Sequence, residues 1–213
     1  MRIALCTDGI HPHAMGGMHE HSRLLAEHLA QSGHVELTVL TPHAERVFDP
    51  ALGITEVRIP PIDPDRSSLL ELWRYSIRVG QKLEELRPDV VLSQGFSVWK
   101  GIEHFTGRMI IHPHGLEMFQ GLTMKERMVG APFRWAVRHI ARRSAVVISL
   151  GGKLTGILQE QMKGSDCRVV VIPNAVDIPE ERSSIASSQA REASPLVLLF
   201  VGRIQPLKAP EGL

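Results

Sequence analysis

The 213-residue sequence has few cysteines, almost no net charge and no long apolar run. Its two cysteines, Cys6 and Cys167, lack CxxC spacing, so neither a disulfide framework nor a zinc knuckle is indicated. A net charge of +1 provides no basic excess of the kind that nucleic-acid binding requires. The N-terminal apolar run is far too short for a signal-peptide core or a membrane span. We therefore expect a cytoplasmic protein without a nucleic-acid partner.

The sequence also lacks the fingerprint of a dinucleotide-binding enzyme. Gly16-Gly17 stands between the first expected strand and the first expected helix, where GxGxxG would be needed. No acidic residue ends the second expected strand, where a dinucleotide enzyme holds the ribose. A dehydrogenase is therefore a distant alternative.

An obvious metal-binding pattern is missing as well. Four histidines stand near the first loop, at positions 11, 13, 19 and 21, but none forms an HExxH pair. His19 and His21 are two residues apart and should point to different sides of a helix start. We expect no metal and no bound cofactor, and we interpret His19 as a polar residue near the mouth of a ligand site.

Strand-like and helix-like segments alternate along the chain, which is typical of a parallel sheet covered by helices. The pattern predicts an α/β, Rossmann-like, doubly wound domain. Gly33 stands where a helix C-cap is expected. The expected strands are residues 3–7, 35–40, 54–59, 89–93, 109–112, 145–149 and 168–172, and the expected helices are residues 18–32, 67–86, 123–143 and 152–162.

The composition changes near the C-terminal end. Residues 180–195 are rich in Ser, Glu, Arg and Ala without an apolar period, as in a linker. A buried-strand pattern follows, and a single strand cannot build a core. It either joins the preceding sheet or opens another domain, which we favour. We divide the chain into an N-terminal domain at 1–177, a linker at 178–194 and the start of a truncated second domain at 195–213.

Two segments carry residues suited to ligand binding. Glycine at Gly16 and Gly17 lets a phosphate approach the backbone beside a helix N-terminus, although a tight turn is the simpler alternative. The segment His112–Glu117 directly follows an expected strand, at the sheet edge where open α/β sheets place ligands. A histidine there can donate to a substrate hydroxyl or help hold a negative charge, and Gly115 lets the chain turn close to it. A capped loop histidine is the alternative.

Basic residues occur in two further places. Arg203 and Lys208 follow the last expected strand, where they could clamp a diphosphate or simply be solvated. The stretch Lys125–Arg143 is a basic amphipathic segment that could rest on an anionic membrane at its cytoplasmic face. We favour the alternative of a surface helix that packs its apolar stripe on the sheet. Its basic residues are Lys125, Arg127, Arg134, Arg138, Arg142 and Arg143.

Five phrases occur in an order that resembles the retaining GT-B glycosyltransferases of family 4. They are GGMHEHSRLLAEHLAQSGHVELTVLT at 16–41, HGLE at 114–117, RWAVRHIARRSAVVISLGGKLTGIL at 134–158, VIPNAVD at 171–177 and LLFVGRIQPLK at 198–208. The resemblance implies two Rossmann-like domains across a cleft. The first mainly holds the acceptor and the second the nucleotide sugar.

The same resemblance implies roles for individual residues. Gly17 would lie in the glycine loop that approaches the donor, and His114 would be the catalytic histidine that contacts the transferred sugar. Arg203 and Lys208 would bind the donor diphosphate. His19, Gly115 and Glu117 would lie near the substrate. Residues 173–177 would begin the interdomain hinge, with alanine at 175 in place of the common glycine.

The family's second domain carries an E-x7-E pair and a nucleobase pocket, and the chain ends before either. We therefore expect an incomplete chain, inactive alone, whose partners are a nucleotide-sugar donor, an unknown acceptor and its own missing C-terminal domain. The family mechanism would be front-face attack, with the leaving diphosphate assisting as base. The alternatives are a related enzyme such as a nucleotide-sugar epimerase, and a stand-alone, non-catalytic nucleotide- or sugar-binding module.

Overall fold

The computed structural model describes residues 1–63, 65, 68–121 and 123–175, and Met1–Ala175 form one compact unit. Several expectations lie outside the described residues: the linker at 178–194, the final strand, Arg203, Lys208 and the end of the hinge phrase.

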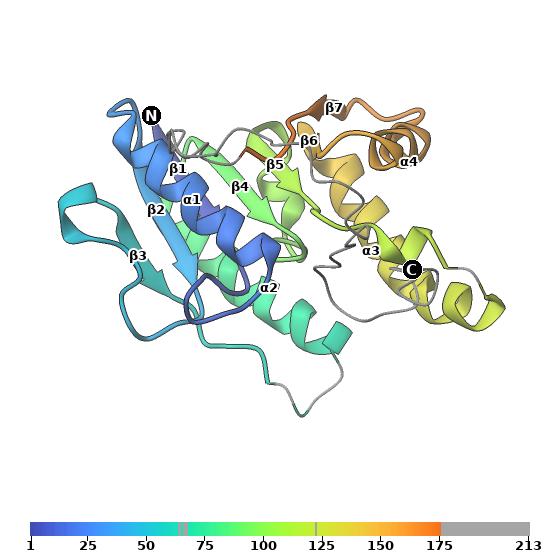
Figure 1. Cartoon of the computed structure of the whole chain (residues 1–213), viewed down its shortest axis with the longest axis horizontal. Coiled ribbons are helices and arrows are strands. Elements are labelled where there is room, and N and C mark those ends of the chain that lie inside the picture. Colours follow the sequence, from blue (N-terminus) through green and yellow to red (C-terminus); the bar gives the residue numbers. More distant parts are fainter. Residues whose placement is uncertain (64, 66–67, 122, 176–213) are drawn as a thin grey trace, which may run out of the picture. The chain divides into compact units, whose positions relative to one another are not determined.

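Seven parallel strands form a single sheet in the order β3-β2-β1-β4-β5-β6-β7 (Figure 1). From β1 the chain builds outward to β3 on one side, and then returns to add β4 to β7 on the other. The reversal makes β1 and β4 neighbours and confirms the doubly wound prediction. The strands are β1 (Arg2–Cys6), β2 (Glu36–Thr41), β3 (Thr55–Arg58), β4 (Val90–Gln94), β5 (Met109–His112), β6 (Val146–Ser149) and β7 (Arg168–Val171).

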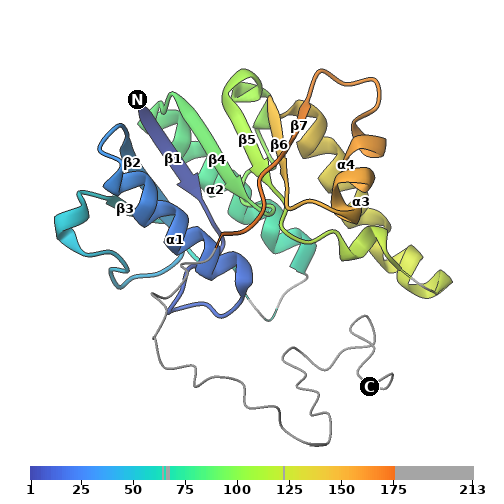
Figure 2. The same cartoon turned by 45° about the horizontal axis from the view of Figure 1, so that its top comes forward.

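Helices cover both faces of this sheet. Figure 2 shows α1 on one face and α2, α3 and α4 on the other. The expected strands and helices between residues 3 and 172 are all present, with ends that differ by one residue at most. The helices are α1 (Gly17–Gln31), α2 (Ser68–Leu86), α3 (Met124–Arg143) and α4 (Lys153–Met162), with short 3₁₀ turns at η1 (Pro50–Leu52), η2 (Ile102–His104), η3 (Thr106–Arg108) and η4 (Glu117–Phe119).

The alternation of side chains along β1 divides the core into two layers. Leu5 belongs to the apolar cluster that includes Ala26 of α1. Its neighbour Cys6 belongs to the cluster on the other face, which includes Tyr75 and Val79 of α2. Because both faces of the central strands are buried, these strands are largely apolar, although β4 ends in the buried polar residues Ser93 and Gln94.

The ends of α1 and α3 follow from local sequence. Gly33 comes just after α1 with φ of 69°, and its N–H donates to the Ala30 carbonyl at 3.1 Å, which confirms the predicted C-cap. At the start of α3, Thr123 Oγ1 accepts from the Glu126 N–H at 3.2 Å, and Glu126 Oε2 accepts from the Thr123 N–H at 3.0 Å. This is a complete capping box.

The basic stretch forms a helix that packs on the core through Ala136, Val137 and Ile140. Five of its arginines donate hydrogen bonds among the described residues: Arg127 to the Gly121 carbonyl, Arg134 to the Met118 and Arg127 carbonyls, Arg138 to the Gln161 side chain, Arg142 to the Gln161 carbonyl and Arg143 to the His139 carbonyl. Within the described residues, no helix has both the length and the apolar character needed to cross a membrane.

Candidate functional site

The candidate site lies at the carboxyl edge of the sheet, beside the paired strands β1 and β4, where the order in which strands are added reverses. Loops from neighbouring strands separate at such a reversal and leave a crevice for a ligand. Gly95, directly after β4, has φ of 57°, and a Cβ there would lie 3.4 Å from the Met18 sulfur of α1. The end of β4 is therefore packed against the first turn of α1.

The start of α1 is open. Gly16 occupies its N-cap position with φ of 146° and ψ of 158°, a conformation that is essentially restricted to glycine. It has no side chain to cap the helix, and no side-chain hydrogen bond caps it. Gly17 differs, because a Cβ there would meet nothing within 4 Å. Of the two predicted glycines, only Gly16 therefore has a backbone conformation that requires glycine.

This start contrasts with that of α3, whose capping box occupies the first-turn N–H groups. Helix α4 also begins without a side-chain cap, at Gly152. An uncapped N-terminus presents unsatisfied N–H donors and the positive end of the helix dipole. At α1 the His19 N–H donates to the Gly16 carbonyl at 3.1 Å, and this first turn packs beside the end of β4.

His114 lies in a tight turn two residues beyond the end of β5. Its φ is 58°, in the left-handed region that a histidine seldom adopts. The Gly115 N–H donates to the Pro113 carbonyl at 2.8 Å and closes a three-residue turn around His114. The ring Nε2 of His114 lies 2.5 Å from Oε1 of Gln94, the last residue of β4. Two strands therefore hold this ring.

Three imidazoles meet at this point. The rings of His112 and His114 stack with centroids 3.8 Å apart. His21, from the second turn of α1, approaches both edge-on at 4.9 and 5.0 Å. Burial lowers the pKa of His112 to about 4 and that of His114 to about 3, and neighbouring histidines add to the effect. Burial also lowers the pKa of His21.

These shifts decide between two roles considered for His114. Its ring is uncharged at neutral pH, because its pKa of about 3 lies far below 7. An uncharged imidazole is a hydrogen-bonding group for hydroxyls and contributes no formal charge to hold an anion. The site geometry therefore favours contact with a hydroxyl over stabilisation of a negative charge.

His19 has the opposite electrostatic character. Its Nε2 lies 3.7 Å from the Asp8 carboxylate, which raises the pKa of His19 despite partial burial. Asp8 directly follows Thr7 at the end of the first strand segment. His19 and His21 thus point toward different partners, as their two-residue spacing predicted. His11, in the same loop, pairs with Glu20 at 3.1 Å.

Gly115 and Glu117 lie together beyond His114. A Cβ at Gly115 would lie 2.3 Å from Glu117 Oε2, so the carboxylate covers the glycine. Glu117 begins η4 and is exposed. The structure therefore brings His114, Gly115 and Glu117 into one turn at the sheet edge, as the sequence phrase indicated.

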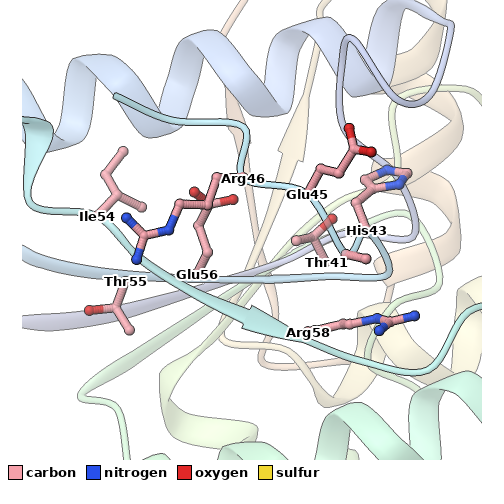
Figure 3. Close-up of a pocket in the computed structure, with 9 residues that line it drawn as sticks. Thr41, His43, Glu45, Arg46, Ile54, Thr55, Glu56 and Arg58 are labelled. Carbon is pink, nitrogen blue, oxygen red and sulfur yellow. The ribbon is translucent and has the colours of Figure 1, made fainter. Parts of the chain in front are cut away.

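A cavity of about 350 Å³ lies beside the ends of β2 and β3. Glu56 shapes its wall, since its carboxylate accepts from the Val47 and Phe48 N–H groups at 3.0 and 3.3 Å. His43 accepts from the Ile10 N–H at 3.1 Å and so ties the cavity loop to the loop after β1. Figure 3 shows its lining: Thr41, His43, Ala44, Glu45, Arg46, Ile54, Thr55, Glu56 and Arg58.

Sequence reasoning missed two residues of the site, Gln94 and Asp8. Each is polar and lies at or just beyond the end of a buried strand, which is the signal that could have found them. Their partners, His114 and His19, were predicted as site residues, but the contacts join residues 20 and 11 positions apart along the chain.

The fold and site together define a class of protein: a doubly wound α/β domain whose candidate site residues lie at the reversal point of its sheet. Residues 15–180 match the family described as Glycosyltransferase Family 4, and the chain belongs to that family. The match covers four of the five sequence phrases and confirms the resemblance there; the phrase at 198–208 lies outside it. A comparison with curated proteins finds no match.

Solved structures share the fold. A sucrose-phosphate synthase from Thermosynechococcus elongatus is 14% identical with a TM-score of 0.61, over 83% of this chain and 48% of that one. The glycosyltransferase WaaG, involved in lipopolysaccharide biosynthesis, is 15% identical with a TM-score of 0.54, over 78% and 44%. A UDP-GlcNAc 2-epimerase from Neisseria meningitidis, solved with UDP-GlcNAc, is 14% identical with a TM-score of 0.51, over 80% and 45%.

These likenesses identify the fold as the N-terminal half of a GT-B fold. The chain spans about half the length of the structures just described. Because transferases and an epimerase share this architecture, the chemistry must be argued from the site.

Proposed function

We propose that the chain is the acceptor-side half of a retaining glycosyltransferase, which moves a sugar from a nucleotide-sugar donor to an acceptor. The conformation of His114 is the observation that supports this proposal most strongly. A non-glycine residue with φ of 58° stores strain of about 1–3 kcal/mol, which persists only where the surroundings enforce it. Here the turn and Gln94 hold an uncharged imidazole at the edge where a sugar hydroxyl would lie.

The start of α1 supports a place for the donor. Gly16 brings the backbone to the crevice without a side chain, and the uncapped helix offers N–H groups to a phosphate. His19, with its raised pKa, lies in the first turn of the same helix and adds positive character as it protonates. We assign the donor phosphates or sugar to this edge; Arg203 and Lys208, the pair predicted to bind the diphosphate, lie outside the described residues.

We assign the acceptor to the cavity beside the ends of β2 and β3. Its lining has two arginines and two glutamates, so its ligand is a polar molecule rather than an apolar one. His43 connects this cavity to the loop that precedes Gly16. In this arrangement the acceptor extends from the cavity across the ends of β1 and β4 to bring its hydroxyl to the donor sugar near His114, and front-face attack with the leaving diphosphate as base requires no metal in the transfer step.

A peripheral contact with an anionic membrane, at the cytoplasmic face, is a second proposal. Met128 and Val129 on α3 are 72% and 64% exposed, beside Lys125 and Arg127. Apolar residues flanked by cations suit a membrane interface. We place the contact at the first turns of the helix, where these exposed apolar residues lie; Arg127 there also donates within the domain, to the Gly121 carbonyl.

The donor proposal is tested by equilibrium binding of UDP-glucose, UDP-GlcNAc and GDP-mannose to the chain. We expect measurable binding of at least one, weakened about tenfold by His114→Ala, which is the effect of losing about 1.4 kcal/mol. His28→Ala is the matched control, since His28 is an α1 histidine that bonds only its own helix. Equal binding by all three proteins, or none by the wild type, would contradict the proposal.

The same mixtures distinguish the alternatives. Conversion of UDP-GlcNAc to its 2-epimer, followed by NMR, would favour an epimerase. Binding without any turnover agrees with either an incomplete transferase or a stand-alone module. Transfer to an added acceptor by the 213-residue chain would contradict the expectation that it is inactive alone.

A further inference from the structure

We propose that His21, His112 and His114 form a binding site for one divalent transition metal ion, with Zn²⁺ the most suitable. One ring nitrogen from each residue can be chosen so that all three lie within 4.8 Å of one another. The residues come from α1 and from the end of β5, so the fold rather than sequence spacing brings them together. The proposal goes beyond glycosyl transfer and does not depend on it.

His112 supplies an independent observation. Its side chain is buried, with the residue 2% exposed, and neither ring nitrogen has a hydrogen-bond partner among the described residues. Buried polar atoms in folded proteins nearly always have a partner, and each exception calls for an explanation such as an ion. A metal ion bound by one ring nitrogen would provide that partner.

Gln94 orients a second ligand. Its Oε1 lies 2.5 Å from His114 Nε2, so the proton of the neutral ring belongs on Nε2 and the lone pair on Nδ1. Metal-binding histidines are commonly held in this way by an acceptor on the other ring nitrogen.

The donor set determines the kind of ion. Three imidazoles suit Zn²⁺, Ni²⁺, Co²⁺ or Cu²⁺, whereas Mg²⁺ and Ca²⁺ prefer oxygen ligands. Zinc–nitrogen bonds of about 2.0–2.1 Å place tetrahedral ligand atoms about 3.3 Å apart, so the stacked rings of His112 and His114 would have to turn until their lone pairs converge. Three protein ligands leave a position for water or a substrate oxygen; because both ring nitrogens of His114 would then be occupied, a sugar hydroxyl would contact the metal rather than this imidazole.

The test is metal binding by the EDTA-treated chain. Calorimetry with ZnCl₂ should show one equivalent bound, and CoCl₂ should give the visible absorption of a tetrahedral nitrogen site. His112→Phe and His21→Phe keep a ring in place, and each should weaken Zn²⁺ binding at least about 100-fold, more than loss of an orienting partner costs. Gln94→Leu should weaken it about 10–100-fold.

His13→Gln is the control, because it removes a histidine from the separate His13–His43 pair, whose ring centroids are 5.0 Å apart. It should leave the affinity unchanged. Should the ring variants fail to fold, X-ray absorption of the wild type must show three imidazoles at about 2.0–2.1 Å from zinc. No stoichiometric binding, or binding that survives His112→Phe and His21→Phe, would overturn the metal site and leave the donor-binding result untouched.

Discussion

At the residue scale, Gly16 and Gly17 are adjacent but have different physical requirements. Gly16 has a φ and ψ that other residues almost never adopt, while Gly17 is helical and has open space around its Cα. Gly16→Ala should lower the free energy of unfolding by about 1–3 kcal/mol. Gly17→Ala should be neutral or slightly stabilising, because alanine favours helix more than glycine does. Urea denaturation of both variants measures this, and equal effects would contradict the assigned backbone geometry.

Burial also governs the two cysteines. Both thiols are free and buried, and burial raises the pKa of Cys167 to about 11 and that of Cys6 further. Thiolate is the reactive form, so alkylation by iodoacetamide at pH 8 should be slow in the native protein and fast in urea. The native rate at Cys167 should rise as the pH approaches 11. Rapid labelling at pH 8, followed by mass spectrometry, would show that these thiols are accessible.

At the scale of elements, α3 depends on its capping box. Thr123→Ala removes the acceptor for the Glu126 N–H and should cost about 1 kcal/mol of stability. Thr123→Ser retains the hydroxyl and should behave nearly as the wild type. Chemical denaturation followed by circular dichroism measures both variants. A Thr123→Ser loss as large as that of Thr123→Ala would mean that the hydroxyl does not cap the helix.

The exposed face of α3 permits a test of the membrane proposal. Met128→Glu combined with Val129→Glu should abolish co-sedimentation with anionic vesicles that contain about 30% phosphatidylserine. Both side chains are exposed, so the folded core should be unaffected. Trp135→Glu, at a 57% exposed position later in α3, is the control. Failure of the wild type to bind these vesicles would rule the proposal out.

Element positions could be predicted because the signals are local. The apolar run of β1, the Tyr75–Val79–Leu83 stripe of α2 and the glycine after α1 each specify structure within a few residues. The alternating pattern predicted a doubly wound sheet with helices on both faces, but it gave neither the strand order nor the face on which each helix lies.

The site was predictable only in part. His114 and Gly115 were found because they directly follow a strand. The contacts of His114 with Gln94 and of both strand-end histidines with His21 could not be found, because they depend on side-chain packing between β4, β5 and α1. Sequence spacing compared His19 with His21 and predicted no metal, whereas the fold brings His21 beside two histidines about 90 positions later.

At the scale of the whole molecule, the described domain supplies one wall of the proposed reaction site. The start of α1 and the His114 turn both lie at the carboxyl edge of the sheet, near β1 and β4. The acceptor cavity lies beside β2 and β3. Donor chemistry therefore belongs to the first location and acceptor recognition to the second. The proposed function depends on this division between a donor site and an acceptor cavity.

Chemical-shift mapping tests that claim most directly. The ¹⁵N-labelled chain would be titrated with the nucleotide sugar that binds best, and amide shifts would be assigned along the sequence. We predict that the largest changes cluster at Gly16–Met18 and His114–Glu117, with little change at Arg46 and Arg58 in the cavity. Changes centred on the cavity, or on the far edge at β7, would contradict the assignment of the donor to the α1–His114 edge.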